Sequence, residues 1–587
     1  MRVFFVVAFA GALLIYSSGL MAPYHLDDGN VLQIAQTFNW QLTRALGFAT
    51  FWLNEQIATV IGPFLPWSAA FYYRLGNVLV HALAATALFW LTKELTGRAV
   101  LAWIAATLFL VHPIQTQAVT YITQRFESQA AMFVFFSAAS YVRFRRTGLR
   151  RWLAAAVVLG AGAALTKETG FMLPIWLVFI ELVFFGGAVD LRKRAVYVIP
   201  LGLLLLFSVW NRLPGILSGP TLRWISLDQY WISQGPILMK YLQLSAWPER
   251  QFLFYDFQPV AAFSWGLVAE WGLVLSVAGA GLFCLRRYPL IGFGLLSFFL
   301  LLLPVMVLPL PDLINEHRVY PAFAGLAIAI AGIYQAINRR SVLAILAVAF
   351  ILLGAKTMLR NAEWNNQLAF LESHRAAFPN DPAILSRLAS YYYLSGYVNR
   401  ALETNLEARR YEGRHNTYYR QQGHLLTSIN LASIYLAKNN PAAAKVEALR
   451  AVAANPAEPF VWRILGQVQL QLGEFEDARR SFERLLALEP GIAAFQGLQE
   501  TAQLSGNTSL AAIAGEFLGV EQQVDVAAQV APFAIPRQYR VYVLFGLTLG
   551  LLLCIVSALW TLWSAGRTLL LHRLPNLPEI NEVRRKS

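Results

Sequence analysis

The fold of this chain is decided by residues 3–30, where the apolar run VFFVVAFAGALLIYSSGLM (3–21) is followed by YHLDDGN (24–30). At about 1.5 Å per helical residue, residues 3–21 are long enough to cross a bilayer core of roughly 30 Å. No small-x-small cleavage site follows the run, so we expect an uncleaved anchor. The adjacent carboxylates Asp27 and Asp28 are therefore predicted to lie just beyond the far membrane face.

The composition of the rest of the chain indicates a polytopic membrane protein. Of 587 residues, 57% are hydrophobic and only 14% are charged, and the mean hydropathy is +0.49. Most of the chain therefore favours lipid over water. The two cysteines, Cys284 and Cys554, both fall inside apolar segments, which implies no disulfide framework and no metal cluster.

The net charge of +14 follows a membrane pattern. Basic residues gather at every second junction between apolar segments, as the positive-inside rule requires. Nucleic-acid binding is not needed to explain the charge. The clusters are Lys93 with Arg98; Arg143, Arg145, Arg146, Arg150 and Arg151; Arg192, Lys193 and Arg194; Arg286 and Arg287; Arg339 and Arg340; and Arg573, Arg584, Arg585 and Lys586.

About twelve spans satisfy every basic cluster and leave both termini cytoplasmic. Parity then places residues 228–250, rich in Trp and Tyr, outside along the membrane interface. The predicted spans are 3–21, 72–92, 99–117, 128–142, 152–167, 170–187, 195–211, 261–284, 289–310, 320–337, 341–359 and 541–563.

Residues 361–520 change to mixed polar and apolar composition at helical spacing, which indicates a water-exposed helical module. Trp462, Gly466, Ala478, Phe482 and Pro490 fit the tetratricopeptide-repeat pattern of about 34 residues. The same frame recurs earlier in two copies, and residues 494–520 resemble a degenerate fourth or capping repeat. The earlier copies contain Leu431, Ala432, Tyr435, Ala444 and Pro456, and Leu388, Ala389, Tyr392 and Ala401.

These patterns divide the chain into five parts. An odd number of crossings before residue 361 places the repeats outside, in the compartment of the Asp pair. Such solenoids bind peptides or proteins and carry no chemistry of their own. The parts are a transmembrane domain at 1–360, a tetratricopeptide-repeat domain at 361–520, a linker at 521–540, a last span at 541–563 and a basic cytoplasmic tail at 564–587.

Several charged groups break the positive-inside pattern, because they are predicted to lie outside and close to the ends of spans. They are Arg125 with Glu127, Lys167 with Glu168, and Glu316-His317-Arg318. Charges at such depth are costly and need partners or a ligand. Ion pairing between helices is one explanation for each group. Their number favours an anion site, and a lipid phosphate is the anion found at that depth.

The order of short motifs makes the chain resemble a known family. It resembles the transmembrane and tetratricopeptide-repeat protein O-mannosyltransferases, within the GT-C superfamily of polytopic glycosyltransferases. The resemblance implies an all-α fold, with a GT-C-type helical membrane domain and an α-solenoid of repeats. The motifs are Asp27-Asp28, RLGNVLVHAL (74–83), HPIQTQAV (112–119), Arg125 with Glu127, Lys167-Glu168, and EHRVY (316–320).

The resemblance also implies an activity and a set of site residues. Members transfer a sugar from a polyprenyl-phosphate donor to protein hydroxyls on the non-cytoplasmic side. Asp27 would be the catalytic carboxylate and Asp28 its neighbour. Gln117 stands where the family often has an acid, and the span at 541–563 departs from members whose repeats end the chain. The donor and substrate cavity would be lined by His112, Gln117, Arg125, Glu127, Lys167, Glu168, Glu316, His317 and Arg318.

The residue types suit this chemistry. A sugar on a lipid phosphate already has a good leaving group, so the reaction needs a base for the acceptor hydroxyl and cations for the departing phosphate. We expect Asp27 to act as base in one inverting displacement, with Arg125 and Lys167 on the phosphate. No cofactor is firmly implied. Asp27 and Asp28 are also suitable ligands for a divalent cation, an alternative that a chelator would test.

Two other functions stay open at this point. One is a non-enzymatic, membrane-anchored repeat scaffold for envelope or pilus assembly, and the other is a transferase acting on a glycan or lipid acceptor. The short outer loops and compact length favour a bacterial inner membrane, with the active site and repeats in the periplasm. The donor lipid would be undecaprenyl phosphate in a bacterium and dolichyl phosphate in a eukaryote.

Overall fold

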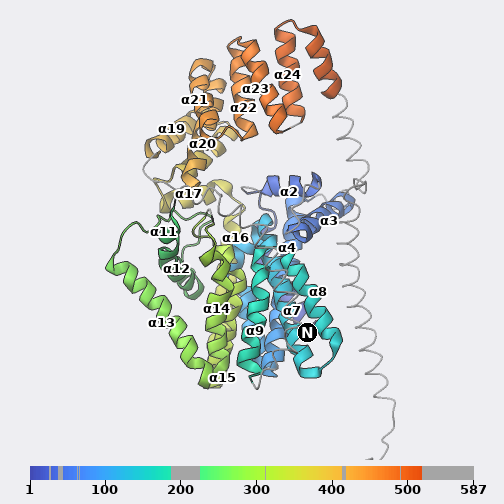
Figure 1. Ribbon diagram of the computed structural model, residues 1–587, viewed down its shortest axis with the longest axis vertical. Coiled ribbons are helices and arrows are strands. Elements are labelled where there is room, and N and C mark those ends of the chain that lie inside the picture. The colour runs from blue at the N-terminus through green and yellow to red at the C-terminus, as the bar shows by residue number, and fades with distance from the viewer. Residues whose placement is uncertain are drawn as a thin grey trace, which may run out of the picture. The chain divides into compact units, whose positions relative to one another are not determined.

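The computed structural model describes residues 1–25, 28–37, 44–61, 64, 67–186, 225–310, 312–412, 418–489 and 491–518. Asp27, the predicted span 195–211, the linker 521–540, the last span 541–563 and the tail 564–587 lie outside these residues. Every regular element in the described part is a helix. The all-α prediction is therefore confirmed for the part of the chain that can be seen (Figure 1).

The membrane part is a set of long helices joined by short helical turns (Figure 1). Its longest helix, α4, has 28 residues. The first nine α-helices are α1 (Arg2–Tyr16), α2 (Asp28–Thr37), α3 (Ala45–Ile61), α4 (Ala69–Thr96), α5 (Ala99–Val111), α6 (Thr116–Thr120), α7 (Arg125–Thr147), α8 (Arg150–Ala164) and α9 (Leu173–Phe184). They are followed by α11 (Leu227–Ile232), α12 (Gln234–Ala246), α13 (Trp265–Arg287), α14 (Pro289–Val307), α15 (Val319–Ile337) and α16 (Arg340–Glu363).

Six described helical segments are long and apolar enough to cross a membrane, and a bent pair makes up to seven. The chain is an integral membrane protein with several candidate spans, whereas the predicted number of about twelve is not established. The predicted spans at 128–142, 152–167 and 170–187 correspond to α7, α8 and α9, which are not among the six. The six are Arg2–Gly19, Ala69–Thr96, Trp265–Arg287, Pro289–Val307, Glu316–Ile337 and Arg340–Glu363.

Glycines set the tight turns and the closest helix contacts. Gly97 and Gly148 take positive φ angles of 72° and 69° just after α4 and α7, the left-handed conformation that ends helices at little cost for glycine. An ideal Cβ on Gly294 of α14 would lie 2.5 Å from the carbonyl oxygen of Gly325 in α15. These two helices therefore pack backbone against backbone, as small residues permit inside membranes.

A proline bends the chain at the end of α5. The bend between Ala99–Val111 and Pro113–Thr120 is 55°, because Pro113 cannot donate the backbone hydrogen bond that would continue the helix. His112 caps the new turn, since its Nδ1 accepts from the Ile114 N–H at 3.2 Å. Residues 112–124 consequently form a series of short turns at one end of the bundle.

The predicted interfacial segment 228–250 forms the short helices α11 and α12. Ile237, Leu238 and Tyr241 of α12 are buried in the main apolar core of the membrane part. Tyr241 also accepts a hydrogen bond from the Asn315 backbone N–H at 3.1 Å through its hydroxyl. This segment therefore closes one side of the core, a packing role that the sequence did not predict.

The repeat part consists of consecutive helix pairs (Figure 1). Ala401, Ala444 and Ala478 are fully buried where the helices of a pair cross, and an ideal Cβ on Gly466 would meet the Phe482 ring at 2.7 Å. The predicted repeat pattern is confirmed. Its helices are α17 (Gln367–Ala377), α18 (Pro382–Leu394), α19 (Val398–Tyr411), α20 (Tyr418–Ala437), α21 (Pro441–Ala454), α22 (Pro459–Gln471), α23 (Phe475–Leu488) and α24 (Ile492–Leu504).

The contact between α14 and α15 gives a first prediction. Gly294→Ala places a methyl group where the backbone of α15 lies, so we expect a loss of about 1–3 kcal/mol in stability and a lower melting temperature in detergent. Gly279→Ala is the matched control, because an added Cβ there meets nothing within 4 Å. If both variants melt with the wild type, the close α14–α15 contact is wrong.

Candidate functional site

One end of the membrane part gathers polar groups from distant segments. Arg74, near the start of α4, donates from Nε to the Thr120 carbonyl at 2.9 Å and from a terminal nitrogen to the Pro23 carbonyl at 2.6 Å. Ser18, just after α1, donates to the Met358 carbonyl in the last turns of α16 at 2.8 Å. The ends of α1, α4, α6 and α16 therefore meet on the same side of the bundle.

Asp28 is fixed at this end by backbone donors. It is fully buried at the first position of α2. One carboxylate oxygen accepts from the His25 N–H at 3.0 Å, and the other accepts from the Thr123 N–H at 3.0 Å. Asp28 thus joins the loop after α1 to the turns before α7. This is a positioning role, whereas its predicted partner Asp27 lies outside the described residues.

Arg125, the first residue of α7, is surrounded by acceptors from the protein itself. Its guanidinium donates to Asn77 Oδ1 at 2.6 Å, Asn54 Oδ1 at 2.7 Å, the Tyr73 carbonyl at 2.6 Å and the Thr50 carbonyl at 3.2 Å. It also stacks over a ring, with Cζ 4.4 Å from the centroid of Phe51. Arg125 therefore holds α3, α4 and α7 together, and four of the five N–H donors of its guanidinium meet protein acceptors.

Lys167 forms a buried ion pair with Glu127. The Lys167 Nζ lies 2.8 Å from Glu127 Oε2 and donates to Gln124 Oε1 at 3.3 Å. The neighbouring Glu168 pairs with Arg44 at 3.3 Å. Two of the predicted site acids thus have basic partners, Lys167 between α8 and η5 (Glu168–Met172) and Arg44 just before α3.

Gln117 links this region to the loop before α15. Its Oε1 accepts from the His317 N–H at 2.7 Å, and its Nε2 donates to the Leu253 carbonyl at 3.3 Å. Arg318 donates to the Leu313 carbonyl at 3.2 Å. His317 and Arg318 both lie within electrostatic reach of Lys167. Glutamine, as a donor and an acceptor, suits this bridging position where the family often has an acid.

His112 and Glu316 support the same loops. The His112 ring packs against Phe323, with centroids 4.3 Å apart. Glu316 accepts from the Phe252 N–H at 2.8 Å, from Gln251 Nε2 at 3.0 Å and from the hydroxyl of Tyr255. Glu316 therefore fixes the segment 251–255.

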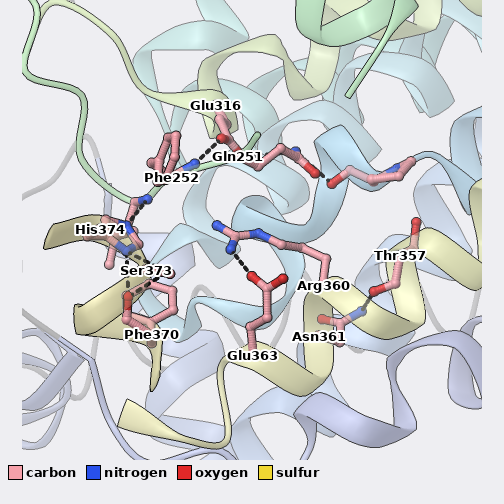
Figure 2. Close-up of polar contacts among 12 residues, drawn as sticks. Gln251, Phe252, Glu316, Thr357, Arg360, Asn361, Glu363, Phe370, Ser373 and His374 are labelled. Atoms are coloured by element: carbon pink, nitrogen blue, oxygen red, sulfur yellow. Dashed lines mark hydrogen bonds and ion pairs between the residues drawn. The ribbon is translucent and has the colours of Figure 1, made fainter. Parts of the chain in front are cut away.

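Sequence reasoning missed the roles of two histidines, of which His25 contacts the end of α16 and His374 ties α17 to the segment after Gln251. The His25 Nε2 lies 3.1 Å from the Trp364 carbonyl, and His374 Nε2 accepts from the Leu253 N–H at 2.8 Å. His374 Nδ1 lies 2.7 Å from the Phe370 carbonyl, to which it donates. Figure 2 shows His374 beside Phe252 and Phe370. His374 belongs to no motif and His25 lies in the YHLDDGN stretch without a predicted role, so only the folded arrangement reveals what they do.

The structure thus brings most predicted site residues to one end of the bundle, in separate groups. Asp28 faces Thr123, Lys167 faces Glu127, and Gln117 faces His317. Within the described residues, no group of three or more His, Cys, Asp or Glu side chains is placed to hold a metal ion. What the arrangement offers is a set of buried charges beside loops that connect apolar helices.

Comparison with known proteins is consistent with this architecture. Residues 59–186 match the family described as Dolichyl-phosphate-mannose-protein mannosyltransferase, and residues 459–492 match a tetratricopeptide repeat. Protein O-mannosyl-transferase Tmtc2 of Drosophila melanogaster is 30% identical over 238 residues, which is 38% of this chain. Protein O-mannosyl-transferase TMTC1 and TMTC2 of Mus musculus are 32% and 37% identical over 118 and 92 residues, or 18% and 16% of this chain.

The fold and the buried polar end define an all-α integral membrane protein that carries tetratricopeptide-repeat helices. Within that class, part of the chain is similar to TMTC-type protein O-mannosyltransferases, and a segment that matches the mannosyltransferase family precedes a tetratricopeptide repeat. The matched segments cover only 24%, 12% and 10% of the three relatives' own lengths, so the chain spans less than a quarter of each by this measure.

The hydrogen bonds of Arg125 to four protein acceptors give a second prediction. Arg125→Lys replaces a planar fork by a single ammonium, which cannot reach all four acceptors. We expect a loss of about 2–3 kcal/mol in stability, from buried acceptors left without donors, measured as a lower melting temperature. Arg98→Lys at the exposed start of α5 should have no effect. A stable Arg125→Lys protein with weakened donor binding would instead support the predicted phosphate contact.

The two buried histidines give a third prediction, on pH. Burial lowers the pKa of His374 from 6.5 to about 3 and that of His25 from 6.5 to about 4. Below pH 6.5 the unfolded chain takes up protons that the folded chain excludes. Stability present above pH 6.5 should therefore fall by about 1.4 kcal/mol per pH unit for each histidine, down to the folded pKa.

This pH dependence can be followed by thermal unfolding between pH 7.5 and 5.0. His374→Gln should flatten the dependence, because an amide does not titrate. A melting temperature that stays constant over this range would contradict the prediction.

Proposed function

We propose that this chain is an integral-membrane glycosyltransferase that moves mannose from a polyprenyl-phosphate donor of the dolichyl-phosphate type to hydroxyl groups of an extracytoplasmic protein. The observation that most directly supports this proposal is the match of residues 59–186 to the mannosyltransferase family. That range contains Arg74, Arg125 and the Lys167–Glu127 pair, all of which lie at the polar end. A scaffold has no need of buried charges at that depth.

In the proposed reaction, Asp27 takes the proton of the acceptor hydroxyl. The hydroxyl oxygen bonds to the sugar carbon in one inverting step, while the bond from that carbon to the lipid phosphate breaks. Asp28 holds the loop in place through the His25 and Thr123 N–H groups. Lys167 and Arg125 are both candidates for the phosphate, because each has one more N–H donor than its contacts among the described residues use. An ammonium has three donors, and the contacts of Lys167 within the described residues use two, on Glu127 and Gln124. A departing dianion would accept the third.

The orientation belongs to the same proposal. The polar end and the repeats would share one non-cytoplasmic compartment, with about twelve spans in the complete membrane domain and both termini in the cytoplasm. The contact between Ser18 and Met358 supports this, because it places the ends of the first anchor and of α16 together. The proposed domain limit at 360 lies close to the end of α16 at Glu363.

A second candidate function is the non-enzymatic scaffold, in which the repeats bind envelope or pilus proteins. The confirmed repeat helices favour protein binding in either case. A transferase with a glycan or lipid acceptor would use the repeats for assembly alone. Loss of glycan from an outer-compartment protein in a deletion strain would support the protein acceptor.

The two aspartates give the deciding experiment. Asp27→Asn should reduce mannose transfer from a polyprenyl-phosphate donor by at least about a thousandfold, because a general base is lost, while the melting temperature stays unchanged. Asp28→Asn should lower both activity and melting temperature, because buried backbone donors lose a charged acceptor. Asp228→Asn, on the exposed start of α11, is the control. Normal turnover by Asp27→Asn would refute the base.

A further inference from the structure

A charged cavity lies beside the outer end of α16. Its volume is about 530 Å³, and it is bounded by the last turns of α16, by α17 and by the segment 248–252. Three cations line it, Arg250, Lys356 and Arg360, together with the acids Glu249 and Glu363. None of these five residues belongs to the predicted donor site. Figure 2 shows Arg360 between Gln251 and Glu363.

Arg360 is buried yet incompletely satisfied. Only 7% of its surface is exposed. One terminal nitrogen donates to Glu363, but Nε is buried and has no hydrogen-bond partner. A buried guanidinium donor without an acceptor is costly and uncommon. The arrangement calls for an acceptor from outside the protein.

The other two cations have no acidic partner in the described part of the chain. Lys356 is half-buried and Arg250 is exposed. Glu316 lies within electrostatic reach of Arg360, but its oxygens are committed to Phe252, Gln251 and Tyr255 in the wall of the cavity. The lining thus carries three positive charges against two negative ones, with Glu363 engaged by Arg360. This balance suits a phosphate, which Arg binds through a fork and Lys as a point charge.

The depth of the cavity matches a lipid headgroup. From Arg340 at the start of α16 to Arg360 there are about 30 Å of helix, at about 1.5 Å per residue, which equals the thickness of the hydrocarbon core. Arg339 and Arg340 mark the other surface of the bilayer in the positive-inside pattern. Lys356 and Arg360 therefore stand where lipid phosphates lie.

An apolar stripe on α16 leads from the bilayer to the cavity. Ile345, Val348, Leu352 and Leu359 are exposed, and at about 3.6 residues per turn they share one face of the helix with Lys356. Leu359 also lines the cavity. Only 11% of the apolar window of α16 is buried. A hydrocarbon chain can lie along this face while its headgroup reaches the cations.

We propose that this cavity binds the phosphate of a membrane lipid, with Arg250, Lys356 and Arg360 on the phosphate oxygens and the hydrocarbon chain along the Ile345–Leu359 face of α16. The shared chemistry is a phosphate oxyanion, and the apolar stripe selects a lipid over free phosphate. The site does not depend on the proposed transferase activity, because cavity, charges and stripe define it without any reacting group.

The test measures binding to the full chain in detergent micelles with three probes, farnesyl phosphate, farnesol and inorganic phosphate, by native mass spectrometry and by thermal shift. Farnesyl phosphate should bind and raise the melting temperature, whereas the other two should bind about tenfold more weakly or not at all. Equal binding of inorganic phosphate would overturn the assignment to a lipid. Equal binding of farnesol would overturn the role of the cations.

The variants separate folding from binding. Arg250→Gln with Lys356→Gln removes two cations that hold no ion pair among the described residues, so the protein should fold and bind farnesyl phosphate about tenfold more weakly. Arg339→Gln, exposed at the opposite end of α16, should bind as the wild type. Leu352→Gln should also weaken binding of farnesyl phosphate. Wild-type binding by the double variant would refute the site.

Discussion

The structure depends on one constraint, the need to satisfy buried polar groups at the end of an apolar helix bundle. Water cannot reach these groups, so each N–H, carbonyl and charge needs a partner from the protein. Arg74 uses the carbonyls of Pro23 after α1 and Thr120 at the end of α6, and Arg125 uses those of Thr50 within α3 and Tyr73 near the start of α4. Asp28 accepts from the backbone of two separate loops. These contacts fix the loops on which any chemistry must take place.

Several charged side chains that could bind a ligand instead hold the fold together. Arg125 has four protein acceptors and stacks on an aromatic ring, whereas Arg360 keeps a buried Nε that has no hydrogen-bond partner within the described residues. Charge near a membrane surface is therefore a weak guide to ligand contact until the partners of each group are known. Cations that lack acceptors within the protein are therefore better candidates for binding a phosphate than Arg125, the arginine that stands out in the sequence motifs.

The two histidines at the α16–α17 junction connect the membrane part with the first repeat helices. His374 orders the segment after Leu253 through its Nε2 and the end of α17 through its Nδ1. The same segment is held by Glu316 from the loop before α15. The short stretch 251–255 is thus held by hydrogen bonds from the membrane part and from the repeats. These shared contacts give a physical route by which the repeats and the polar end can influence each other.

Much of this architecture was determined by the sequence alone. Apolar runs predicted helices such as α4, α14 and α15, and the repeat frame predicted that Ala401, Ala444 and Ala478 would be buried. These are local properties, since hydropathy and helical period act within one segment. The sequence could not decide the number of spans, because α7 is too polar, and α8 and α9 are too short, to be identified as spans from length and hydropathy. Only the tertiary structure decided which partner each polar side chain meets, since Arg125 and Asn77 are 48 residues apart and Gln117 and His317 are 200 apart. Such pairs depend on how helices pack, and no pattern along the chain records that.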